Sequence, residues 1–155
     1  MTTTSSSTRA VVVLLVGLGA LCGAARPTAA QLLQVQPATI TLPSSDPDTV
    51  PVIAAAPIRI SYIAQGAPNP WTITIRAGGD LISGASTIPI SNVSWTATPS
   101  PPFRNGTLTT VAQTLATGTG LINISRGDVT FRFVNSWNYT VGNYTQTVTF
   151  TLSSP

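Results

Sequence analysis

Alternation of apolar and polar residues is clearest near the C-terminal end of the sequence. Between residues 143 and 152, Tyr144, Val148 and Phe150 share one parity, and threonines fill most positions of the other. A period of two is that of a β-strand with one face in a core and one face toward water. The same pattern, bounded by Gly, Pro, Asn and Asp, recurs at residues 31–42, 58–63, 71–77, 93–98 and 129–133.

These segments predict an all-β protein. We expect about seven to nine short strands with turns every 8–12 residues, which is the signature of an antiparallel β-sandwich. Residues 58–63 and 71–77 are separated by a single turn-rich stretch and are predicted to form a hairpin. The tripeptide Arg126-Gly127-Asp128 is predicted to be a turn between strands.

The first 30 residues are predicted to be a secretory signal peptide. A polar start carrying Arg9 precedes the apolar run of residues 10–22, and Thr28-Ala29-Ala30 fits a cleavage site. Residues 31–155 then form a single domain. Retention of the leader as an anchor stays open, although the run is short against the roughly 20 apolar residues that a membrane span needs.

The charge and residue content of residues 31–155 excludes several classes of function. This part holds five arginines and four aspartates, which leaves one net positive charge, and it has no Lys, Glu, His or Cys. The arginines are scattered, so we expect no nucleic-acid partner. Without His or Cys, neither a catalytic triad nor a zinc site can be built. We therefore expect a non-enzymatic protein without disulfide, metal or cofactor.

The acidic residues are interpreted as turn residues. Asp46-Pro47-Asp48 could offer oxygen atoms to calcium, but a calcium site needs six to eight ligands, and the sequence places no other acid nearby. A loop in which an Asp side chain bonds its own backbone explains the same residues.

The three tryptophans divide into two groups. Trp71 and Trp95 lie on the apolar parity of their strands and are predicted to be in the core. Trp137 lies in a turn-like stretch beside Tyr139 and is the best candidate for an exposed ring. Trp137 and Tyr139 are therefore the candidate ligand-binding residues.

The closing pattern of the chain resembles a known kind of domain. It consists of Gly142, Tyr144, Thr147, Val148, Phe150 and Leu152 in the order G-x-Y-T-x-T-V-T-F-T-L. This is similar to the last strand of bacterial secreted pilin-like and spore-coat-U-like domains. The resemblance covers residues 137–152 and implies an immunoglobulin-like sandwich. Many members of that family polymerise when the N-terminal strand of one subunit completes the sheet of the next. The present chain departs from the family in lacking a disulfide.

Two hypotheses of function follow. The first is an exported structural protein of the cell surface or extracellular matrix, a fibre subunit that assembles by β-strand addition. Residues 31–42 would be the donor strand, or else would pair within their own domain, and a weakly charged surface would favour self-association. The second is a secreted module that binds a carbohydrate or a cell-surface partner. The groove-filling positions of the donor strand would be Leu33, Val35, Ile40 and Leu42.

Overall fold

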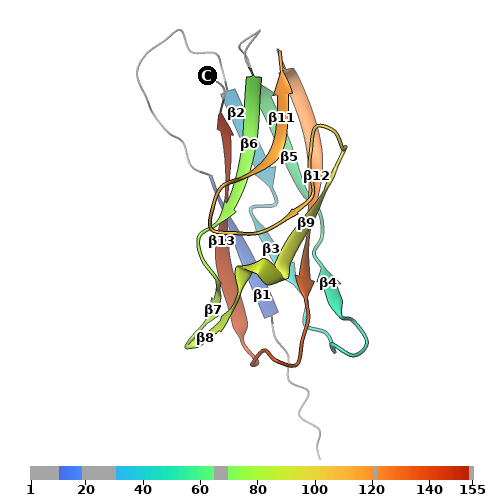
Figure 1. The fold of residues 1–155 in the computed structure, drawn as a ribbon, viewed down its shortest axis with the longest axis vertical. Coiled ribbons are helices and arrows are strands. Elements are labelled where there is room, and N and C mark those ends of the chain that lie inside the picture. The colour runs from blue at the N-terminus through green and yellow to red at the C-terminus, as the bar shows by residue number, and fades with distance from the viewer. Residues whose placement is uncertain (1–10, 19–30, 65–69, 121, 154–155) are drawn as a thin grey trace, which may run out of the picture.

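The computed structural model is a two-layered β-sandwich (Figure 1). It describes residues 11–18, 31–64, 70–120 and 122–153. These residues contain thirteen strands and one short 3₁₀ helix, which confirms the all-β sandwich and exceeds the expected number of strands. The strands are β1 (Val11–Leu18), β2 (Gln31–Gln36), β3 (Thr39–Leu42), β4 (Val52–Ala54), β5 (Ile58–Ala64), β6 (Pro70–Ala77), β7 (Leu81–Ser83), β8 (Ser86–Ile88), β9 (Val93–Thr98), β10 (Gly106–Thr107), β11 (Gln113–Thr119), β12 (Ile122–Val134) and β13 (Asn143–Ser153).

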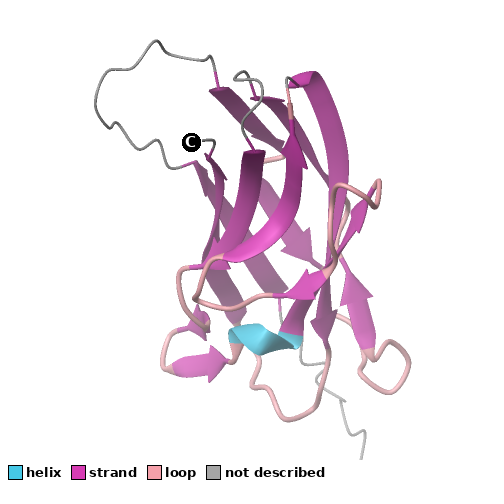
Figure 2. Ribbon diagram, turned by 45° about the horizontal axis from the view of Figure 1, so that its top comes forward, coloured by secondary structure: helices cyan, strands magenta, loops and turns pink. Residues whose placement is uncertain are grey.

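Each layer is one sheet. In the first sheet the strand order is β11-β6-β13-β1-β3, with the short strands β7 and β8 continuing from β13. In the second sheet the order is β10-β9-β12-β5-β2, with β4 beside β12. Figure 2 shows short strands beside the long ones of the two sheets. Two of the unexpected strands, β7 and β10, have only three and two residues, which is too few for alternation to be recognised, whereas β1 has eight. The 3₁₀ helix covers Ile90–Asn92, and no helix in the described ranges could span a membrane.

The core lies between the two sheets and is filled by the apolar parity of the long strands. In β5 and β6 every second residue is buried, as the alternation predicts. Among the described residues, no polar or charged side chain is buried. Tyr62 contacts Trp71 and Phe103 across the core, with ring centroids 4.9 and 6.1 Å apart. The core is therefore held by apolar burial and by aromatic contacts, which suits a domain without disulfides.

The predicted hairpin of residues 58–63 and 71–77 is wrong. β5 pairs with β12 and β2 in one sheet, whereas β6 pairs with β11 and β13 in the other. Each strand has one apolar face, and placing the strands in opposite sheets buries both faces against each other. Alternation reports only that one face is buried, so it does not tell a hairpin from a connection between sheets.

The predicted turn at Arg126-Gly127-Asp128 is also wrong. These residues lie inside β12, where Gly127 is opposite Ile60 of β5. A side chain at Gly127 would collide with the ring of Phe103, so the glycine provides room for a core aromatic residue. Asp128 instead accepts a hydrogen bond from Arg59 of the neighbouring strand, with 3.2 Å between Nε and Oδ1.

The segment of residues 31–42 crosses from one sheet to the other. β2 pairs with β5 in the second sheet, and β3 belongs to the first. Pro37 lies between the two strands and has no N–H to donate, so a continuous ladder is interrupted there. The crossing closes one side of the sandwich and places β3 next to β1.

Candidate functional site

The first candidate site is the position of β1 in the first sheet. β1 lies between β13 and β3 (Figure 1) and runs parallel to β13. Its pairing with β13 is continuous over eight residues, from Val11 opposite Asn143 to Leu18 opposite Phe150. It also pairs with β3 in the antiparallel sense over four residues. We call this place between β13 and β3 the insertion site.

Both walls of the insertion site are strands with well-buried apolar residues. On β13 these are Tyr144, Val148 and Phe150, and on β3 they are Ile40 and Leu42. Within the described residues, β1 is the only sheet partner of β3. The strand β1 therefore joins β3 to the rest of the sheet. Without it, two strand edges would face each other across an unfilled space.

The predicted assembly residues do not share one environment. Leu33 and Val35 lie on β2, at the edge of the second sheet, and pack half-buried against the core. Ile40 and Leu42 lie on β3 and are 4% and 1% exposed. In this structure the whole segment pairs within its own chain, with β2 on β5 and β3 on β1. The first two residues are thus on an edge strand and the last two form a wall of the insertion site.

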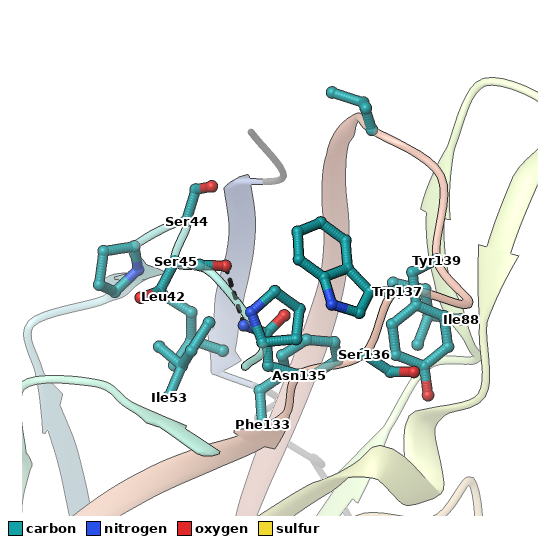
Figure 3. A pocket seen from close by; sticks show the side chains of 13 residues that line it. Leu42, Ser44, Ser45, Ile53, Ile88, Phe133, Asn135, Ser136, Trp137 and Tyr139 are labelled. Carbon is teal, nitrogen blue, oxygen red and sulfur yellow. Dashed lines mark hydrogen bonds between the residues drawn. The ribbon is translucent and has the colours of Figure 1, made fainter. Parts of the chain in front are cut away.

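The second candidate site is a hollow at one end of the sandwich, lined by the loop of residues 135–141 and by the loop that follows β3. We call it the Trp137 hollow. Its base lies between the sheets and includes Ile53 and Phe133. Figure 3 shows the indole of Trp137 on one side of the hollow and Ser44 on the other. Leu42 lines this hollow and also pairs with β1, so the two candidate sites adjoin.

The two ligand-binding candidates differ in exposure. Trp137 is 63% exposed, whereas Trp71 and Trp95 are each 2% exposed, in agreement with the predicted division. Tyr139 is half-buried, and its ring lies 5.7 Å from that of Phe133. Tyr139 therefore supports the loop from beneath, and Trp137 presents the open aromatic surface.

Hydrogen bonds between distant loops fix the walls of the hollow. The Nδ2 of Asn135 donates to the carbonyl oxygens of Ser45 and Val50, at 2.9 and 3.1 Å. The indole Nε1 of Trp137 donates to Oδ1 of Asp48 at 3.1 Å. These contacts join segments more than eighty residues apart in the sequence, and they hold the exposed ring in one orientation.

The four aspartates all make local or structural contacts. Asp46 Oδ1 accepts the backbone N–H of Asp48 at 2.8 Å, which is the self-bonded loop expected for these residues. Asp80 Oδ1 accepts the N–H of Ile90 at 2.9 Å, and Asp128 pairs with Arg59. In the described ranges no three His, Cys, Asp or Glu residues gather into a metal-binding group.

Sequence reasoning missed the insertion site and part of the hollow. Residues 11–18 belong to the predicted leader, and the signal for a strand there is a run rich in Val, which has strong β-propensity. Ser44, Ser45 and Asn135 gave no signal, because the hollow that they line depends on two loops far apart in the sequence.

Comparison with known proteins does not add to this geometry. No protein-family model matches the chain, and no curated protein matches it either. The function is therefore argued from the two sites themselves.

Proposed function

We propose that this chain is an exported, non-enzymatic structural protein that assembles by β-strand addition at the insertion site. Its destination is the cell surface or the extracellular matrix. The observation that carries the proposal is the position of β1, an apolar strand taken from the predicted leader, between β13 and β3. If the leader is removed after Ala30, residues 31–155 contain all of the sandwich except this strand.

The vacated insertion site would then have the chemistry of a strand acceptor. Both β13 and β3 would present backbone N–H and C=O groups that had been paired with β1, and open edges of this kind recruit another strand. The apolar residues of the two walls would line the groove between them. An incoming strand would gain affinity from main-chain hydrogen bonds and specificity from its alternate side chains.

The proposed donor is β2 of a second copy. Once the leader is removed, β2 holds the first residues of the chain, and among the described strands its only sheet partner is β5. Leu33 and Val35 are half-buried and on one face, so the strand can leave its own sheet at lower cost than a central strand. Leu33 and Val35 would fill the groove of the neighbour, and Ile40 and Leu42 would line the groove that receives them.

Electron microscopy of two forms of the protein tests the proposal. The full chain should remain monomeric, because β1 fills its insertion site, whereas residues 31–155 should form filaments. Removing residues 31–36 as well should abolish the filaments while leaving a chain that binds a synthetic peptide of residues 11–18. Uniform monomers of residues 31–155, as resistant to heat as the full chain, would contradict the proposal.

A matched pair of substitutions identifies the face of the donor strand. Leu33→Ser changes a residue on the groove-filling face, and Leu32→Ser changes the neighbouring leucine, which is 53% exposed on the opposite face. We expect Leu33→Ser to reduce filament formation and Leu32→Ser to leave it unchanged. If the two substitutions reduce filament formation equally, β2 is not the donor strand.

A further inference from the structure

We infer that the Trp137 hollow is a binding site for a neutral carbohydrate, in which a sugar ring stacks on the indole of Trp137. This site adjoins the insertion site at Leu42, but its rim is built from loop side chains and not from a strand edge. Three features of the hollow favour this ligand: the orientation of the indole, the uncharged lining, and the hydroxyl groups opposite the ring.

The indole offers its face and not its N–H group. Nε1 of Trp137 already donates to Asp48, so a ligand would meet the ring surface of a side chain that is 63% exposed. A large exposed aromatic ring is unfavourable in water, and rigid aromatic rings of this kind are typical anchors of binding sites. Because both loops are hydrogen-bonded, a ligand would not need to order the ring on binding.

The lining of the hollow carries no charge. The residues around it are apolar, proline, serine, asparagine, tryptophan and tyrosine, and none is an arginine or aspartate. A phosphate or carboxylate ligand would leave water without a positive counter-charge in the lining, and it would lie near the Asp48 carboxylate that accepts the indole N–H. The lining therefore disfavours an anionic ligand and suits a neutral one.

Hydroxyl groups lie across from the indole. Ser44 and Ser45 are both half-buried, and within the described part of the chain neither side chain has a hydrogen-bond partner. A purely aliphatic ligand would cover these hydroxyls without bonding them, whereas a sugar has an apolar C–H face for the ring and hydroxyls for the serines. Of the neutral ligands, a pyranose matches both walls.

Titration of the full chain with neutral oligosaccharides tests the inference. The probes are hexasaccharides of β-1,4-glucose, α-1,4-glucose and mannose, with an oligogalacturonate of the same length as the charged comparison. Because Trp71 and Trp95 are buried, a change in tryptophan emission reports on Trp137. We expect a saturable change with at least one neutral probe, unaltered by salt, and no tighter binding of the oligogalacturonate.

Calorimetry on variants assigns the binding to the ring. Trp137→Ala should weaken binding by at least about tenfold, since a buried aromatic anchor commonly contributes that much, and Trp137→Phe should retain part of it. Val111→Ala, at an exposed apolar residue outside the hollow, is the control. The inference is overturned if no neutral probe binds, if Trp137→Ala binds as well as the parent, or if an apolar peptide occupies the hollow and excludes the sugar.

Discussion

The insertion site and the Trp137 hollow meet at Leu42 but are built by different kinds of interaction. The insertion site is made of backbone: two strands, β13 and β3, whose edges are both satisfied by β1. The hollow is made of side chains: strand residues form its base, and two loops form its rim, which is fixed by hydrogen bonds from Asn135 and Trp137. A backbone site accepts any strand with the right alternation, whereas a side-chain site depends on a few specific groups.

The difference has a consequence for mutation. A substitution that truncates a buried side chain of β13 or β3 removes core packing, so it should lower the stability of the whole domain. A substitution in the loops around the hollow removes one or two hydrogen bonds at the end of the sandwich, so the domain should still fold. Three substitutions test this difference in stability effects. They are given in order from the core of β13 to the rim of the hollow.

The largest effect is expected for Phe150→Ala on β13. This ring is fully buried, and its loss should lower the free energy of unfolding of the full chain by about 3–5 kcal/mol, the usual cost of a phenylalanine truncated to alanine in a core. Urea unfolding measures the change, and Thr145→Ala, at an exposed position of the same strand, is the control. A decrease in the free energy of unfolding below about 1 kcal/mol would mean that Phe150 of β13 is not packed in the core.

An intermediate effect is expected for Asn135→Ala. The substitution removes both Nδ2 hydrogen bonds and leaves the carbonyl oxygens of Ser45 and Val50 without this donor. The free energy of unfolding should fall by about 1–3 kcal/mol, mainly because the carbonyl group of Ser45 loses its partner in a partly buried place, whereas the bond to Val50 is exposed. Asn138→Ala, in the same loop but exposed, should change it by less than about 0.5 kcal/mol. If Asn135→Ala and Asn138→Ala lower the free energy of unfolding equally, the hydrogen bonds of Asn135 between the loops do not contribute to stability.

The same contrast explains what could be predicted from the sequence. Alternation with a period of two can be recognised from neighbouring residues alone. For this reason the prediction of β13 and of its buried residues Tyr144, Val148 and Phe150 is confirmed. The residues of a strand do not show which other strand it pairs with. For this reason the hairpin of β5 and β6 was wrong, and the glycine of β12 was mistaken for a turn residue.

The hollow was predictable only in part, for a related reason. The turn-like surroundings of Trp137 indicated an exposed ring, and that holds. The wall opposite it comes from a loop some ninety residues earlier, joined by Asn135 to Ser45, and no local pattern encodes such a contact. The place of β1 could not be predicted for a different reason, because the apolar run of residues 11–18 fits a leader as well as a strand.

The smallest effect on stability is expected for Asp48→Ala, at the rim of the hollow. Its carboxylate accepts the indole N–H in an exposed place, so the free energy of unfolding should fall by no more than about 1 kcal/mol. The orientation of Trp137 should change more, because the ring loses the bond that fixes it. Acrylamide quenching of tryptophan emission should therefore increase in Asp48→Ala, while Asp48→Asn, which keeps an acceptor oxygen, should stay close to the parent. If quenching is the same in all three proteins, the bond does not position the ring, and the Trp137 hollow has no pre-ordered aromatic surface for a sugar.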